Sequence, residues 1–344
     1  MILVTGAAGH LGANLVRRLL RDGAGVRVLL RTEAERATVR DLPAQAIVGD
    51  VRDADAVWRA VEGCAQIYHC AALVSTVDRD HQALFDCNVL GTRNVLRAAL
   101  AAGAERVVVS GSFSATGHLP NRPSDESVPF NPLDRHLPYS HTKAAVEHEC
   151  LKAHAEGLAV VVAVSTAILG PWDFMPSRMG RVLLRFAAGE LRAYVPGGFE
   201  FVSASDIAEG HVLAMARGRP GQKYIFATEF LTFDQIIAMF GRVTGQARHP
   251  VRVPPGLMLA AAAVTGRVMS VVAPRREQLL NSAAIRILRM GRRADTTRAR
   301  EELGFRPGSV EAAVAEAHQW FQASGFMSER RRPAAAGLTA GALP

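Results

Sequence analysis

The hydrophobic positions in the first half of the chain fall into short apolar runs separated by longer amphipathic segments. Short runs rich in Val, Ile and Leu are typical of buried strands, whereas apolar residues three or four positions apart are typical of helices. The pattern predicts strands at Ile2–Thr5, Val26–Leu30, Ala46–Val48, Gln66–Cys70, Arg106–Ser110 and Ala159–Val164. It predicts helices at Leu11–Asp22, Asp53–Val61, His81–Ala102 and Ser140–Glu156.

The order of these elements indicates the fold class. Strands that are apolar along their whole length and alternate with helices form parallel sheets covered on both faces, with ligands at the carboxyl ends of the strands. After Gly170, prolines and glycines interrupt this rhythm. We therefore expect an α/β fold. A Rossmann-type doubly wound parallel sheet would span residues 1–169, with later returns near 199–228, and a smaller C-terminal substrate-binding region would comprise residues 170–198 and 229–327.

Two segments of the C-terminal half have a distinct character. Residues 328–344 have no hydrophobic period, and we expect them to form a disordered tail. The longest apolar run, Leu257–Ala273, is interrupted by polar residues and is too short for a membrane span of about 20 residues. We expect a buried helix there, with a helix lying on a membrane surface as the alternative. Because the first residues carry no basic and apolar leader, we expect a cytoplasmic protein without stable membrane insertion.

Composition excludes several classes of protein. With 49% hydrophobic and 21% charged residues, the chain has the composition of a globular protein. Its four cysteines show no C-x-x-C spacing, which argues against a zinc site or a disulfide framework. The formal net charge of +8 is spread along the chain, and the dense cluster Arg330–Arg332 lies in the predicted tail, so we expect no nucleic-acid partner. Lysine occurs only at Lys143, Lys152 and Lys223, which suggests positions that need its compact ammonium.

A glycine-rich turn directly follows the first predicted strand. The sequence TGAAGHLG places glycines at Gly6, Gly9 and Gly12, and after His10 a helix begins at about Leu11. Such a turn lets the backbone approach a pyrophosphate, and the N–H groups of the helix N-terminus then face the phosphates. In this context the motif predicts a dinucleotide site, and the alternative is a plain tight turn.

Arg31 stands at the end of the second predicted strand, where NAD-binding sites usually have an acid. No carboxylate appears until Glu33. Arg31 can pair with a 2′-phosphate, with Thr32 donating and Arg36 assisting, which favours NADP(H) over NAD(H). The alternative is a solvated arginine that opens a surface helix, so NAD(H) stays open.

Asp50 ends the third predicted strand and is followed by Val51. Its carboxylate can accept a hydrogen bond from the adenine amino group, which makes both residues candidates for cofactor binding. The alternative is that Asp50 caps a turn before Asp53. The sequence does not decide between the two.

Tyr139 and Lys143 lie four residues apart at the start of a predicted helix, hence on one face about one turn apart. A tyrosine of pKa about 10 is a poor acid and base at neutral pH, and a nearby ammonium would stabilise its phenolate. The same ammonium can hold the ribose hydroxyls of a nicotinamide. Upstream, the fifth strand ends in the hydroxyls of Ser110 and Ser112, and Ser112 would donate to the substrate oxygen. The alternative is an unrelated surface tyrosine and lysine.

Taken together, these motifs resemble the extended short-chain dehydrogenase/reductase family, from Met1 to about Phe321. The resemblance implies a catalytic serine at Ser112, with Ser114 as the alternative, an acid/base at Tyr139, and a ribose-binding lysine at Lys143. It also implies further cofactor-binding residues, namely Ala71, Ala72, Ser110, Ser165 and Thr166. Asn88 would support the backbone of the active site. The family commonly has Arg-Pro near Val164 and Ser165, so this chain departs from the pattern there.

Within that family the chain looks most like dihydroflavonol 4-reductases, 3-beta-hydroxysteroid dehydrogenases and hopanoid-associated sugar epimerase-like proteins. The resemblance implies reduction of a ketone or aldehyde, or oxidation of the alcohol, on a moderately apolar molecule. A sugar-nucleotide epimerase or dehydratase that retains NAD is the alternative, and a non-catalytic NADP-sensing regulator is a further one. The family also implies a homodimer through two of the predicted helices. Apolar residues of the lid would face the substrate or form the lid core: Phe174, Met175, Met179, Leu183, Leu184, Phe186, Leu257 and Met258.

Overall fold

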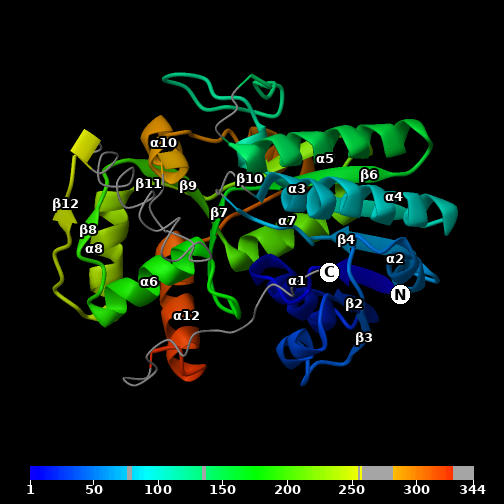
Figure 1. Cartoon of the computed structure of the whole chain (residues 1–344), viewed down its shortest axis with the longest axis horizontal. Helices are drawn as coiled ribbons and strands as arrows, with labels where there is room; N and C mark the ends of the chain where they lie inside the picture. Colours follow the sequence, from blue (N-terminus) through cyan, green and yellow to red (C-terminus); the bar gives the residue numbers. More distant parts are fainter. Residues whose placement is uncertain (76–79, 134–136, 255, 258–281, 328–344) are drawn as a thin grey trace.

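The computed structural model describes residues 1–75, 80–133, 137–254, 256–257 and 282–327 of the 344-residue chain (Figure 1). The predicted tail, residues 328–344, lies outside the described residues. So does most of the apolar run Leu257–Ala273, of which only Leu257 is described. Met258 lies outside them as well.

A seven-stranded parallel sheet forms the first half of the molecule. Its spatial order is β10-β6-β5-β4-β1-β2-β3. The strands are β1 (Ile2–Thr5), β2 (Val26–Leu30), β3 (Ala44–Val48), β4 (Gln66–His69), β5 (Arg106–Ser112), β6 (Val160–Ser165) and β10 (Lys223–Phe226). The strand order reverses between β1 and β4, and such a switch point opens a crevice for a ligand at the carboxyl edge. The predicted doubly wound sheet is confirmed.

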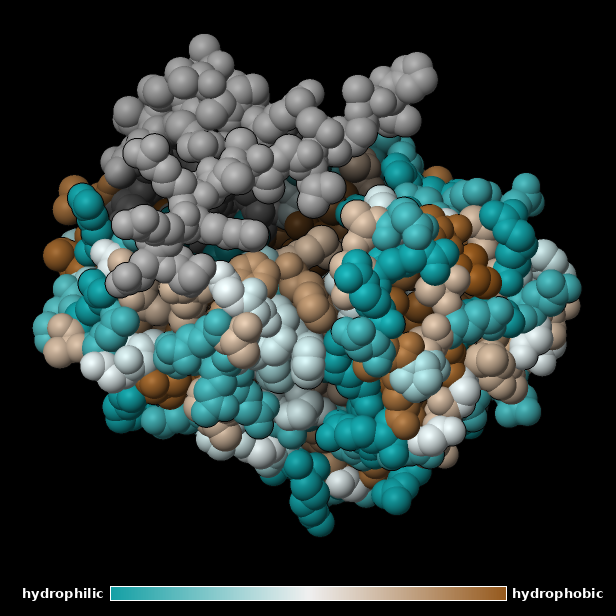
Figure 2. All heavy atoms as spheres, turned by 90° about the horizontal axis from the view of Figure 1, so that it is seen from below, coloured by the Kyte–Doolittle hydropathy of each residue, from teal (hydrophilic) through white to brown (hydrophobic). Residues whose placement is uncertain are grey.

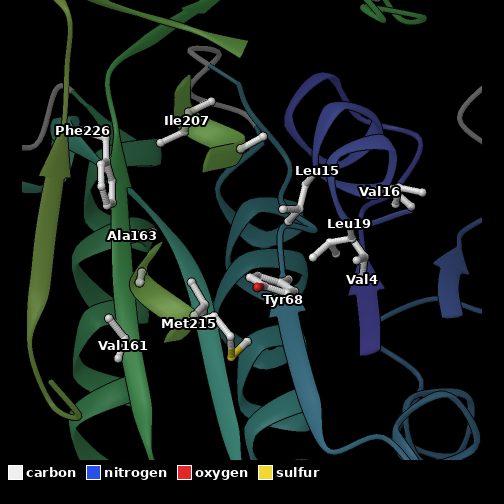
Figure 3. Packing of buried hydrophobic residues seen from close by; sticks show 14 of the residues in the cluster. Val4, Leu15, Val16, Leu19, Tyr68, Val161, Ala163, Ile207, Met215 and Phe226 are labelled. Carbon is white, nitrogen blue, oxygen red and sulfur yellow. The ribbon is translucent and has the colours of Figure 1, made fainter. Parts of the chain in front are cut away.

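Helices cover both faces of this sheet (Figure 1). One face carries α1 (His10–Arg21), α7 (Ala204–Arg217) and α11 (Thr297–Leu303). The other carries α2 (Ala54–Val61), α4 (Gly91–Ala101) and α5 (Pro138–Ala155). Figure 3 shows Leu15 of α1 and Ile207 of α7 among buried side chains of the strands, including Tyr68 and Val161. Each such side chain contributes about 1.5–3 kcal/mol when fully buried.

The helix predicted over His81–Ala102 is interrupted by a wider turn. The chain forms α3 (His81–Leu84), then the π-helical segment η3 (Phe85–Leu90), and then α4. Asn88 lies inside η3, and its side chain bonds to the backbone of the segment after β4. A π-helical turn inside a helix often marks a functional position.

The second half of the molecule has its own core. A three-stranded sheet in the order β11-β9-β7 lies among four helices. The strands are β7 (Ala167–Leu169), β9 (Gly198–Ser203) and β11 (Glu229–Thr232), and a small pair joins β8 (Ala193–Tyr194) to β12 (Val251–Arg252). The helices are α6 (Arg178–Ala188), α8 (Phe233–Thr244), α10 (Ser282–Met290) and α12 (Val310–Ala323). Two short 3-10 turns, η1 (Glu33–Thr38) and η4 (Phe113–Ala115), complete the described elements.

The predicted return of residues 199–228 to the large sheet is therefore only partial. Helix α7 and strand β10 do join it, whereas β9 pairs with β7 and β11 in the second sheet. Three of the predicted lid residues, Met179, Leu183 and Phe186, are buried in the core of the second half. For these three the structure favours the lid-core alternative.

Hydrophilic and hydrophobic residues are interspersed over the face of the molecule seen in Figure 2. Within the described part of the chain, no helix has the length and apolar character needed to span a bilayer. The same residues contain no group of three His, Cys, Asp or Glu side chains arranged to hold a metal ion.

Candidate functional site

The glycine turn is shaped by contacts that exclude side chains at two of its three glycines. Gly6 has φ +68°, and a Cβ atom added there would lie 2.6 Å from the backbone nitrogen of Ala71. A Cβ on Gly12 would lie 2.2 Å from the carbonyl oxygen of Gly6. At Gly9 the nearest atom, the same oxygen, is 3.2 Å away. Gly6 and Gly12 therefore allow close packing of the turn against neighbouring backbone atoms. The surroundings of Gly9 are less crowded.

Helix α1 begins at His10 with no side-chain cap and no acidic residue in its first turn. The first N–H groups of a helix have no partner within the helix, and the helix dipole favours an anion in front of them. The backbones of His10, Leu11 and Gly12 supply these groups. This end of α1 fits the pyrophosphate of a dinucleotide, as the sequence predicts.

The side chains of α1 hold the connection that leads to the second half of the molecule. His10 Nε2 lies 3.1 Å from the carbonyl oxygen of Gly170, and Asn14 donates to the carbonyl oxygen of Pro171 at 2.9 Å. The guanidinium of Arg17 lies 3.9 Å from the ring centre of Trp172, a residue with the unusual φ of +61°. The His10 side chain is thus engaged with Gly170, and contact of its backbone with a cofactor stays a prediction.

At the adenosine end of the crevice, Arg31 is an exposed side chain with an acidic partner. Its guanidinium lies 3.3 Å from one oxygen of Glu35, and its backbone N–H donates to the other at 2.8 Å. Glu35 was not predicted as a partner of Arg31, because only the turn of η1 brings the two together. Glu33 pairs with Arg36, whereas η1 folds Glu35 back onto Arg31.

Asp50 is held by Arg52, whose backbone N–H and guanidinium donate to its carboxylate at 2.8–3.0 Å. Burial alone would raise the pKa of Asp50, but these hydrogen bonds outweigh it and leave the pKa lowered. A turn also joins the Asp53 N–H to the Asp50 carbonyl oxygen at 3.0 Å. The turn-forming alternative is therefore observed, and the adenine contact stays a prediction. The side chain of Val51 is buried against Gly91 at the start of α4.

The three predicted catalytic residues converge at the carboxyl ends of β5 and β6. Tyr139 and Lys143 lie in the first two turns of α5, and Ser112 at the end of β5 is near enough to the Tyr139 side chain to influence its pKa. Ser112 also shares a hydrogen bond of 2.9 Å with Ser114, so both predicted serines contact one another. Lys143 is 5% exposed, and its Nζ donates to the Ser110 carbonyl oxygen at 2.9 Å.

The protonation of this site follows from its burial. Burial raises the pKa of Tyr139 to about 12, and the nearby Ser112 hydroxyl acts in the opposite direction. Burial lowers the pKa of Lys143 to about 8. Lys143 was predicted to lower the pKa of Tyr139, whereas in the protein alone burial is the largest effect on that pKa. Activation of Tyr139 by the ammonium stays a prediction.

Buried polar side chains form hydrogen bonds that connect the elements around the site. Asn88 bonds to the backbone N–H and carbonyl of Leu73 at 2.7 and 3.0 Å, and its amide donates to Thr142 on α5 at 3.0 Å. His69, at the end of β4, bridges Thr5 and Thr92 at 2.8 and 2.9 Å. The supporting role that the resemblance implied for Asn88 matches these contacts. The network around His69 was missed, since nothing in the spacing of its members brings them together.

The other predicted cofactor residues lie along the same sheet edge. Ala71 donates its backbone N–H to Thr5 at 3.3 Å, and both Ala71 and Ala72 are half-buried. Ser165 pairs with Ser112 between β5 and β6, and Thr166 follows it. Ser110 is the exception, because its hydroxyl contacts His211 on α7 at 2.8 Å. Its side chain is thus engaged within the protein.

Comparison with known proteins agrees with this geometry. Residues 2–227 match the family model described as "NAD dependent epimerase/dehydratase family". The "Sterol demethylase protein B" of Methylococcus capsulatus is 42% identical over 325 residues, covering 94% of this chain and 99% of that protein. The "4-hydroxy-2-methyl-3-oxo-4-farnesyl-3,4-dihydroquinoline-1-oxide ketoreductase" of Stigmatella aurantiaca is 31% identical over 320 residues, covering 88% and 90%. The crystal structure of gox2253 superposes with a TM-score of 0.82 at 30% identity, covering 95% and 99%.

Proposed function

The chain belongs to the NAD dependent epimerase/dehydratase family, and from this premise we propose that it reduces a carbonyl group of a moderately apolar small molecule, or oxidises the corresponding alcohol. It is an NAD(P)-dependent oxidoreductase acting on CH–OH or C=O groups. The observation that carries the finer proposal is the convergence of Tyr139 and Ser112, which is near enough to lower the pKa of the phenol, with Lys143 one turn further along α5.

The residues of the chain divide the work of reduction among them. A nicotinamide held in this crevice would supply the hydride that reduces the carbonyl carbon. Ser112 donates a hydrogen bond to the carbonyl oxygen, where negative charge develops. Tyr139 then transfers its proton to that oxygen, and a phenol of pKa about 12 is fully protonated and ready to donate at neutral pH. Lys143 stabilises the phenolate that is left and holds the ribose hydroxyls.

The proposed substrate is a ring ketone or alcohol with a large apolar part. Two relatives support this class, since their names refer to a sterol and to a farnesylated dihydroquinoline oxide. The second half of the chain contributes half-buried apolar side chains next to its core, among them Phe174 and Leu184. Apolar linings suit substrates of this kind.

NADP(H) is the proposed cofactor. The exposed guanidinium of Arg31 at the end of β2 supports this choice, because it can turn from Glu35 to a 2′-phosphate at low cost. The glycine turn and the N-terminus of α1 fit the pyrophosphate that both nicotinamide dinucleotides share.

A panel of sterol-like ketones, smaller ring ketones and nucleotide sugars, each assayed with NADPH and with NADH, tests the proposal. We expect stoichiometric oxidation of NADPH with an apolar ketone. The alternative, an epimerase or dehydratase, predicts conversion of a nucleotide sugar without net NADPH oxidation, and NAD that copurifies with the protein. That result would overturn the reductase assignment.

A further inference from the structure

A buried histidine outside the catalytic group contacts the strand that carries Ser112. His211 lies on α7 and is 0% exposed. Its Nδ1 lies 2.8 Å from the carbonyl oxygen of Ile207, and its Nε2 lies 2.8 Å from Ser110 Oγ. A carbonyl oxygen only accepts hydrogen bonds, so Nδ1 carries the proton and Nε2 is an acceptor. The hydroxyl of Ser110 therefore donates to His211.

Ser110 is held from both faces of the large sheet. Its hydroxyl is bound by α7 on one face, and its carbonyl oxygen accepts the Lys143 ammonium from α5 on the other. Figure 1 shows α5 and α7 on either side of β6. The pairing of β5 with β4 ends one residue earlier, at Val109 and His69. The pairing of β5 with β6 continues to Ser112 and Ser165, so the contacts of Ser110 support the end of β5 where β4 no longer pairs with it.

The residues that follow Ser110 make this anchor important. Gly111 comes next and is enclosed by β6, since a Cβ atom there would lie 2.7 Å from a methyl group of Val162. Ser112 comes directly after it and lies near enough to Tyr139 to lower the pKa of the phenol. A shift of Ser110 would reach Ser112 through one glycine, and it would move the oxygen that holds Lys143.

We propose that His211 is a positioning residue of the active site: as a neutral acceptor it fixes Ser110, and through Ser110 it fixes the Lys143 ammonium and the approach of Ser112. The inference rests on the proposed function, because it assumes that Lys143 and Ser112 act on cofactor and substrate. Nothing in the His211 contacts requires the ring itself to gain or lose a proton.

The charges around Lys143 are consistent with a neutral ring. Burial lowers the pKa of His211 to about 4 and that of His69 to about 3. Both rings are thus neutral at physiological pH, and neither places a second cation beside Lys143. The titratable groups that face Lys143 are His69, Cys70, Cys87, Glu147, Cys150 and His211.

Two substitutions of His211 test whether its role depends on the hydrogen-bond acceptor that it offers to Ser110. The amide oxygen of glutamine in His211→Gln reaches about as far as Nε2 and keeps an acceptor for Ser110. The shorter His211→Asn keeps a donor for Ile207 but does not reach Ser110. We expect His211→Gln to retain kcat within about threefold, and His211→Asn to lose at least about tenfold in kcat with little change in KM, since small displacements of reacting groups are costly.

Binding of NADPH as a function of pH provides a readout that needs no substrate. Because the Lys143 ammonium is lost as pH rises through about 8, wild-type affinity falls across that range. In His211→Asn a displaced carbonyl holds the ammonium less well, so the fall moves to lower pH, whereas His211→Gln follows the wild type. Thermal unfolding of both variants is measured alongside.

The outcomes distinguish the two proposals. Unchanged kcat and an unchanged pH profile in His211→Asn would overturn the positioning role. Equal losses in both variants, in step with lowered thermal stability, would also overturn it and leave His211 a core residue only. If no ketone is reduced by the wild type but the binding profile of His211→Asn moves as expected, the substrate assignment fails and the positioning role stands.

Discussion

The two ends of the proposed cofactor crevice differ in how their charged side chains are paired and buried. At the adenosine end, charged side chains near the surface pair with each other, as Arg31 does with Glu35 and Asp50 with Arg52. At the nicotinamide end, Lys143 is buried and donates to a backbone carbonyl rather than to a carboxylate. Exposed ion pairs are weak and exchange partners readily, whereas a buried polar group left without a partner is costly.

This difference separates choice of cofactor from catalysis. We expect substitutions at the surface end to have little effect on folding and to change which dinucleotide binds. We expect substitutions at the buried end, where the polar groups are already paired, to change the rate of reaction. The glycine turn is expected to affect both. Four substitutions test this division.

Tyr139→Phe removes the proton donor and should have the largest effect. We expect kcat for ketone reduction to fall by about a thousandfold, which lies within the usual contribution of a general acid. The dissociation constant for NADPH, measured from the fluorescence of the bound dinucleotide, should stay near wild type. Tyr224→Phe is the matched control, since Tyr224 lies on β10 and donates to Glu302. Turnover preserved in Tyr139→Phe would refute the acid role.

Gly12→Ala tests the turn that joins the two ends. Its Cβ atom would lie 2.2 Å from the Gly6 carbonyl oxygen, a backbone atom that has little room to move. Forcing in the methyl group should lower the free energy of unfolding by about 2 kcal/mol and weaken both NADPH and NADH. Urea denaturation provides the measurement. Gly9→Ala, with its nearest atom at 3.2 Å, should lose less stability, and equal losses in the two variants would contradict the packing argument.

Arg31→Ala addresses the surface end. Loss of the guanidinium should weaken NADPH binding by about tenfold, corresponding to one charge-assisted pair in a solvent-exposed place, and leave NADH binding unchanged. Titrations of both dinucleotides at two salt concentrations measure the effect. If NADH affinity fell equally, Arg31 would not be a contact of the 2′-phosphate.

Glu35→Gln should have the smallest effect, and in the opposite direction. Removing the carboxylate that pairs with Arg31 frees the guanidinium and removes a negative charge near the expected 2′-phosphate. We expect NADPH to bind about two- to threefold more tightly, and less so at high salt because exposed charges are screened. Weaker NADPH binding would mean that Glu35 orients Arg31 rather than competing for it.

The sequence determined the parts of this protein that depend on neighbours along the chain. Apolar runs predicted the strands of the large sheet, the spacing of Gly6, Gly9 and Gly12 predicted the turn, and the four-residue separation of Tyr139 and Lys143 placed both on one helix face. These features follow from the periods of strand and helix and from steric limits at glycine.

Tertiary structure alone decided which distant residues meet. The fold brings His211 to Ser110, His69 between Thr5 and Thr92, and Glu35 back onto Arg31. It also decided that burial, and not the Lys143 charge, has the larger effect on the pKa of Tyr139. Hydrogen bonds and desolvation depend on distances in space, which local sequence patterns do not specify, so the network around the site became visible only when the sheet and its helices were assembled.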